Sequence, residues 1–153
     1  MHRLAHGLAI GLLVALGLFL IAFGLLYANV RSMLPFHAAA IPLDHRQAAE
    51  PLYFALMKLI GGASIGLGGL GLFLTWQAAR LRSMSRVAAI GIAYSIAILT
   101  AAYVAETLAD ATGAPTSWHI MGGLMAGLIV ACASYGAGLA LHPQKRNLAG
   151  KFD

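Results

Sequence analysis

The chain has 153 residues, of which 60% are hydrophobic and only 10% are charged, and its mean hydropathy is +0.81. Soluble domains carry roughly a quarter charged residues, so this composition excludes an ordinary water-soluble domain and indicates an integral membrane protein. The formal net charge of +5 would suit nucleic-acid binding in a soluble protein. Here the basic residues stand beside apolar runs, where they set membrane topology and meet lipid headgroups, so nucleic acid is not an expected partner.

Four apolar runs are each long enough to cross a hydrocarbon layer of ~30 Å. The first contains no charge and is longer than the core of a signal peptide, which favours an uncleaved helix. No strand pattern competes with the four runs, so we expect one all-α domain over residues 1–153. Short connections favour an up-down-up-down four-helix bundle. The spans are expected at residues 7–30, 51–76, 87–108 and 118–141, with an outer loop at 31–50.

The basic residues of the connections predict the orientation of this bundle. Only Arg31 and Arg46 belong to the outer loop, whereas seven basic residues lie on the other side of the spans. The positive-inside rule then places both termini in the cytoplasm. We expect the chain to be integral to the inner membrane. The seven residues are Arg3, Arg80, Arg82, Arg86, Lys145, Arg146 and Lys151.

The composition of the outer loop is typical of a segment that lies against the outer surface of the bundle. Pro35 and Pro42 stiffen it, and apolar residues surround both prolines. It can be an anchored connection or a lid over a pocket at the rim. Asp44 and Gln47 resemble a capping box, and Pro51 is expected to break or kink the entry to the second span.

Ionisable residues inside a span cost roughly 2.5–3.5 kcal/mol on insertion scales, so each one needs a reason. Lys58 and Glu106 lie at similar depths on helices that run in opposite directions, which predicts that Lys58 approaches Glu106 or Asp110. A lysine that snorkels to water and a purely structural ion pair are the alternatives to a ligand site. The candidate ligand-binding residues are His37, Lys58, Tyr103, Glu106, Asp110 and His119.

Some of these residues are also metal-ligand types. No two histidines have the spacing of a helical metal motif, and none lies near the centre of a span. We therefore predict no resident cofactor and no metal, with a haem or metal at the outer rim as the alternative. The single cysteine, Cys132, excludes disulfide and dithiol chemistry. No nucleophile or acid–base motif is present, which favours a protein that is not an enzyme.

Two stretches, MLPFHAAAI at 33–41 and LMKLIGG at 56–62, resemble small uncharacterised four-helix bacterial membrane proteins of the DoxX-like and domain-of-unknown-function type. In that pattern a Met-Pro-Tyr-His-like loop precedes a helix with a basic residue and a glycine pair; Leu34 and Phe36 depart from it. The resemblance covers roughly a third of the chain and implies the fold and the membrane location only. The corresponding residues are Met33, Pro35, Phe36, His37, Lys58, Gly61 and Gly62.

Glycines four residues apart let helices approach closely in lipid. We expect Gly62 with Gly66, and Gly123 with Gly127, to pack helices inside the bundle, or against a second copy or another membrane protein. Compact size and small-residue faces favour an accessory or structural subunit of a larger membrane complex. A binder of a small molecule, lipid or quinone at the rim is the alternative. An oligomeric transporter is a further one, although the first span lacks the glutamate that small multidrug exporters carry there.

Overall fold

The computed structural model describes residues 2–113 and 118–140, and over that part the chain is helical without strands. The predicted all-α class is therefore confirmed for the described residues. Four of the helices are long and apolar enough to cross a membrane. Lys145, Arg146 and Lys151 of the orientation argument lie outside the described residues. The helices are α1 (His2–Ala28), α2 (Pro35–Ala39), the short 3₁₀ helix η1 (Leu43–His45), α3 (Arg46–Leu81), α4 (Met84–Thr112) and α5 (His119–Ala140).

The second long helix begins earlier than the sequence predicts. Pro51 lies inside α3, which starts at Arg46, so Pro51 does not break the entry to this helix. The carbonyl group that its missing N–H leaves unpaired belongs to exposed Gln47, where water can take the place of the donor. The predicted capping box is wrong, because the residue that caps α3 is His45, which makes no side-chain cap hydrogen bond, while Asp44 lies in η1.

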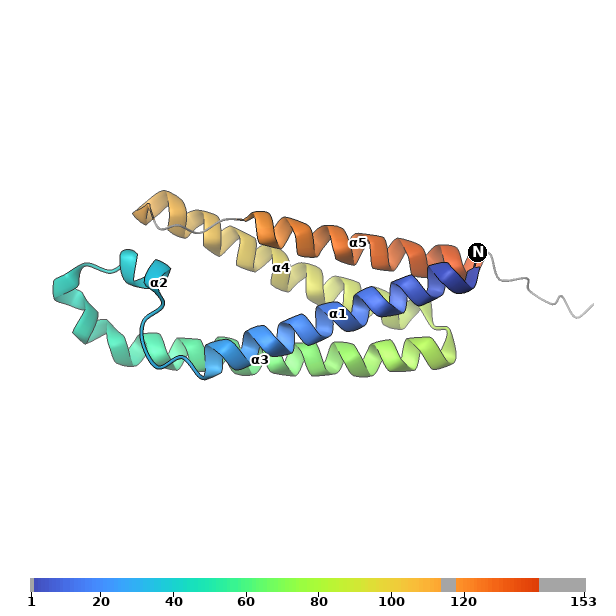
Figure 1. Ribbon diagram of the computed structural model, residues 1–153, viewed down its shortest axis with the longest axis horizontal. Coiled ribbons are helices and arrows are strands. Elements are labelled where there is room, and N and C mark those ends of the chain that lie inside the picture. The colour runs from blue at the N-terminus through green and yellow to red at the C-terminus, as the bar shows by residue number, and fades with distance from the viewer. Residues whose placement is uncertain (1, 114–117, 141–153) are drawn as a thin grey trace, which may run out of the picture.

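Figure 1 shows the four long helices lying side by side, with α1 crossing obliquely from α5 to α3. Helix α1 packs against both α3 and α5, and α4 packs against α5 and less extensively against α3. We call the end that carries the start of α1 and the turn between α3 and α4 the amino-terminal end. The opposite end, with α2, η1 and the last turns of α4, is the loop end.

The buried core lies toward the amino-terminal end. Among the described residues, the buried positions of α4 stop at Ile98 and those of α5 begin at Leu128. The later turns of α4 and the first turns of α5 therefore diverge from α1 and α3. Toward the loop end the bundle opens into two arms, one formed by α1 and α3 and the other by α4 and α5 (Figure 1). The largest fully buried side chains are Leu13, Thr75, Val87, Ile90, Tyr94, Leu128 and Tyr135.

Two tyrosines join the arms within this core. The side chain of Tyr94 on α4 lies directly against Gly71 of α3, in the space that any side chain at Gly71 would fill. The hydroxyl of Tyr135 on α5 donates a hydrogen bond to the carbonyl oxygen of Ala78 on α3 over 2.8 Å. Both contacts hold the arms together on the amino-terminal side, so they fix where the opening starts.

The backbones of helices α1 and α3 approach each other closely at glycines of both helices. A methyl carbon added at Gly61 would lie 2.7 Å from the carbonyl oxygen of Gly24, and one added at Gly68 would lie 2.7 Å from that of Gly17. Gly17 and Gly24 are seven residues apart, as are Gly61 and Gly68, so the two pairs meet in one antiparallel register. Only glycine at these positions permits this approach.

The four glycines that the sequence analysis selected do not make this contact. A methyl carbon added at Gly62, Gly66, Gly123 or Gly127 would meet nothing within 4 Å. The expectation that these four pack helices inside the bundle is therefore wrong. Successive residues of an α-helix are rotated by about 100° around the helix axis. Gly61 therefore lies at the contact with α1, whereas Gly62 lies on the outside. Packing against a second copy or another protein stays a prediction.

Candidate functional site

The connection between α1 and α3 folds back on itself through hydrogen bonds of its own residues. Pro35 opens α2, and the backbone N–H groups of His37 and Ala38 donate to the carbonyl oxygen of Leu34 over 2.9 and 2.8 Å. Arg46, the first residue of α3, closes the loop. Its Nη2 donates to the carbonyl oxygen of Ala38 over 2.7 Å and its Nε to that of Ile41 over 3.1 Å. The guanidinium therefore fixes α2 above the start of α3.

Tyr53 of α3 connects this loop to the bundle. Its side chain is buried, and its hydroxyl oxygen accepts the backbone N–H of Leu34 over 3.1 Å and lies 3.0 Å from Nδ1 of His37. Because the hydroxyl proton has no other acceptor among the described residues, we assign Tyr53 as the donor to Nδ1. Burial lowers the pKa of His37, which favours the neutral imidazole. With this assignment the imidazole proton is on Nε2, and the Nε2–H has no partner in the described chain.

Aromatic rings from three helices surround His37. The Phe36 ring lies 4.3 Å from the imidazole, the Tyr53 ring 5.4 Å and the Tyr27 ring 6.4 Å, as centroid separations, and Phe23 lies 4.3 Å from Tyr27. The Tyr53 and Tyr27 rings contact the imidazole edge-on, a favoured geometry for aromatic pairs. We call Phe23, Tyr27, Phe36, His37 and Tyr53 the aromatic cluster.

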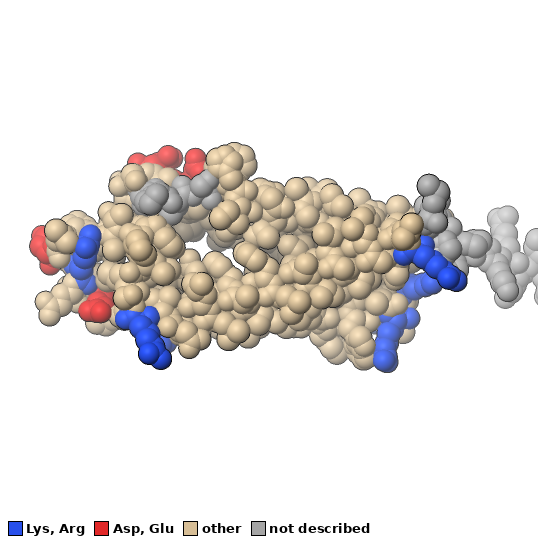
Figure 2. Space-filling model, in the orientation of Figure 1, with Lys and Arg blue, Asp and Glu red and all other residues tan. Residues whose placement is uncertain are grey.

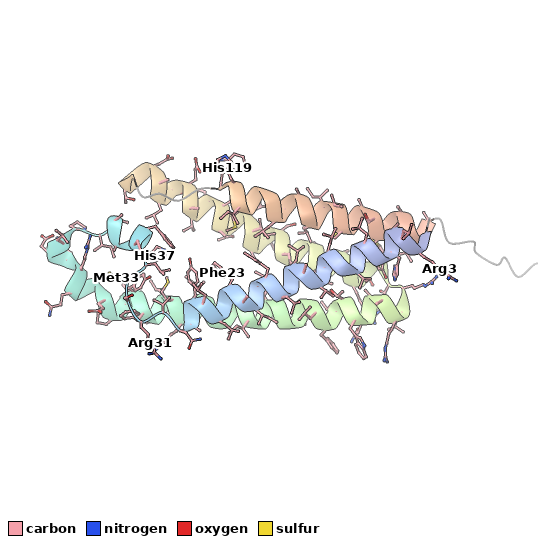
Figure 3. All side chains as sticks on the ribbon, viewed as in Figure 1. Arg3, Phe23, Arg31, Met33, His37 and His119 are labelled. Atoms are coloured by element: carbon pink, nitrogen blue, oxygen red, sulfur yellow. The ribbon has the colours of Figure 1, made fainter. Side chains whose placement is uncertain are left out.

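The aromatic cluster lies where the two arms separate. Figure 3 shows Phe23 at the last turns of α1, and His37 on the side of α2 that faces α3. The space-filling view in Figure 2 shows the surface hollowed between the arms at the same level. Phe23, Tyr27, Phe36 and His37 are half-buried, and Tyr53 is buried.

Among the described residues, the hydrogen bonds and ring contacts of the aromatic cluster include no lysine, arginine or acidic side chain. Glu50, three residues before Tyr53, and Arg31, four residues after Tyr27, are the closest in sequence, and both are exposed. The guanidinium of Arg46 is occupied by the two loop carbonyls. The arrangement therefore suits an uncharged ligand with a flat, apolar body and a hydrogen-bond acceptor.

Of the candidate ligand residues, only His37 belongs to the cluster. Lys58, Tyr103, Glu106 and Asp110 are exposed, and no hydrogen bond or ion pair among the described residues joins Lys58 to either carboxylate. The reason is the divergence of α3 and α4, which separates residues that lie at equal depths. The structure does not bring this set together.

His119 is also remote from the aromatic cluster. Its ring stacks on Trp118 with centroids 4.6 Å apart, and Figure 3 places it on the outward side of α5, away from His37. As for metal ligands, no group of three or more His, Cys, Asp or Glu side chains gathers among the described residues. Asp44 and His45 form a close pair of 3.5 Å, and both are exposed.

Sequence reasoning missed Tyr27, Tyr53 and Phe23 as parts of the site. One available signal was the spacing of Phe19, Phe23 and Tyr27, which places three rings on one face of α1 at intervals of four residues. No comparable signal marks Tyr53, because its partners lie 16 and 19 residues earlier in the chain.

No family model, curated protein or solved structure matches the chain. The resemblance to DoxX-like proteins stays a prediction.

Proposed function

We propose that the chain is an inner-membrane protein whose loop end binds a small, uncharged, lipophilic molecule, a quinone being the class that fits best. The observation that carries this proposal is the neutral His37, held by Tyr53 with its Nε2–H unpaired in the described chain, inside a wall of aromatic rings. A quinone carbonyl accepts such a hydrogen bond, and its ring stacks on aromatic side chains. Its apolar tail suits the hollow between the arms.

Membrane insertion is the first part of this proposal. Four long apolar helices support it, and so does the charge pattern, in which Arg3, Arg80, Arg82 and Arg86 all belong to the amino-terminal end. The bundle would then run up-down-up-down with both termini in the cytoplasm. Reporter fusions after residue 153 and within residues 111–116 test this: they should report opposite sides of the membrane, and an extracytoplasmic carboxyl terminus would overturn the orientation.

Ligand binding is tested with decylubiquinone, a short-chain quinone, by calorimetric titration of the purified protein in lipid nanodiscs. A neutral hydrogen bond contributes about 0.5–1.5 kcal/mol, so His37→Ala should weaken binding about 3- to 10-fold. His45→Ala is the matched control, because that imidazole is exposed at the same end. Absence of binding to the unmodified protein, or equal loss in both variants, would refute the assignment.

An accessory subunit is the second candidate. The observation in its favour is that Gly62, Gly66, Gly123 and Gly127 leave open space on the helix surfaces, where a partner helix from another protein or a second copy can approach. Gly127→Leu should leave the chain folded and remove that partner. Native mass spectrometry after gentle extraction measures this, and a monomer in both forms would exclude the subunit.

A further inference from the structure

In the described part of the chain, acidic residues occur at one end of the bundle only, whereas basic residues occur at both ends. The acidic residues of this part all belong to the loop end, where Figure 2 shows them in red, while the amino-terminal end carries blue side chains and no red on the face drawn. The acidic residues are Asp44, Glu50, Glu106 and Asp110. The basic residues of the amino-terminal end are Arg3, Arg80, Arg82 and Arg86. The described residues of this end therefore attract anions.

Three side chains near the end of α3 form an outward-facing column. The rings of Phe73 and Trp76 lie 5.9 Å apart, and the guanidinium carbon of Arg80 lies 4.4 Å from the centre of the Trp76 ring. Phe73 is 51% exposed and Trp76 49% exposed, so the rings face the surroundings of the bundle and not its core. In a membrane, tryptophan favours the headgroup level, which places the Arg80 guanidinium beside the lipid phosphates.

Arg82 stands two residues further, at the turn that ends α3. Its backbone is left-handed, with φ 48° and ψ 46°, and its side chain is exposed. Arg86, by contrast, donates to Oε1 of Gln77 over 2.7 Å and so ties α4 to α3. Arg80 and Arg82 form no ion pair among the described residues. Two guanidinium groups are thus exposed at one rim, and no carboxylate of the described residues neutralises them there.

We propose that Trp76, Arg80 and Arg82 form a binding site for the headgroup of an anionic phospholipid. The guanidinium groups donate to the phosphate oxygens, while an acyl chain lies along Phe73 and Trp76. A zwitterionic lipid carries its own cation, so it gains less from the same two arginines. The site is at the opposite end of the bundle from the aromatic cluster, and it rests on the proposed function only for membrane insertion.

Trp76 itself can report this lipid. The chain has two tryptophans, so a Trp118→Phe background leaves Trp76 as the only one. Quenching of its fluorescence is measured in vesicles of brominated phosphatidylglycerol mixed with unlabelled phosphatidylcholine, and in the reverse mixture. The ratio of the two gives the preference for the anionic lipid. Loss of the Arg80 stack alters the fluorescence in both mixtures equally, so the ratio remains comparable between variants.

Each arginine near an anionic surface favours the anionic lipid by about fivefold, so Arg80→Gln and Arg82→Gln together should bring the preference close to one. Arg31→Gln is the control, since this exposed arginine follows α1 at the loop end. A preference that survives the double substitution, or one that inorganic phosphate abolishes at constant ionic strength, would overturn the lipid site. Absence of quenching in both mixtures would instead refute membrane insertion, and the site with it.

Discussion

Two neighbouring glycines of α3 allow a direct test of the contact between α1 and α3. In Gly61→Ala the new methyl carbon would lie 2.6 Å from the backbone nitrogen of Ala28 and 2.7 Å from the carbonyl oxygen of Gly24, whereas ordinary contact begins at 3.4 Å. Helix α1 must then withdraw by roughly 0.7 Å, and a gap of that size forfeits about a quarter to a half of the dispersion energy of each contact affected. In Gly62→Ala the methyl carbon meets nothing within 4 Å.

The two variants share the same chemical change in the same helix. Any gain from replacing glycine by alanine, up to about 1 kcal/mol, is therefore common to both. The difference between them reports the clash alone, and overpacking of this kind costs about 1–3 kcal/mol. We expect Gly61→Ala to be less stable than Gly62→Ala by that amount.

Reversible unfolding in mixed micelles of increasing dodecyl sulfate content, followed by circular dichroism, gives both free energies of unfolding. Gly24→Ala should behave like Gly61→Ala, and the double variant should cost less than the sum of the single ones, because α1 has already withdrawn. Equal stability of Gly61→Ala and Gly62→Ala would refute the proposed register of α1 on α3.

Three further predictions concern the loop end. Arg46→Met removes two hydrogen bonds to loop carbonyls, each worth about 1.5–3 kcal/mol because the donor is charged, and the amides of α2 should exchange hydrogen faster by mass spectrometry. Burial lowers the pKa of His37 below its ordinary value of 6.5, so at a pH between the two values the unfolded chain binds more protons than the folded chain. The free energy of unfolding should therefore fall as the pH drops through 6.5 toward the lowered pKa. His37→Gln should flatten that decline, whereas an unchanged decline, or the same flattening in His45→Gln, would contradict it. Lys58→Met and Glu106→Gln should have additive effects on the free energy of unfolding, and a coupling energy above about 0.5 kcal/mol would contradict the separation of these residues.

The sequence predicted the long helices because their signal is local. An apolar run of about 20 residues is visible without knowledge of its neighbours, and four such runs became α1, α3, α4 and α5. The start of α3 was less predictable. Pro51 looked like a boundary, but the water-exposed position of the affected carbonyl group allows the helix to continue through it.

Which faces of the helices meet was much harder to predict. The spacing of Gly62 and Gly66 suits a helix contact, yet Gly61 and Gly68 make it, and only the glycines on α1 distinguish the two sets. The equal depths of Lys58 and Glu106 along their helices likewise predicted an approach of the two side chains. The structure keeps them apart, because residues of equal depth on diverging helices are separated. His37 was recognisable from its loop, but its pairing with Tyr53 depends on how that loop folds back.

If the bundle spans a membrane as proposed, the unequal lengths of its helices determine the level at which the aromatic cluster meets the bilayer. Helix α3 has 36 residues and α5 has 22, and both end at the amino-terminal end. If Trp76 marks one surface of the bilayer, Tyr53 lies about 23 residues away along α3, or ~35 Å, close to the opposite surface of a ~30 Å hydrocarbon layer. The first turns of α3 would then project into water, and the aromatic cluster would lie at the boundary between headgroups and acyl chains, where amphipathic molecules accumulate. The proposed ligand would then reach its site by diffusing within the leaflet, without first dissolving in water.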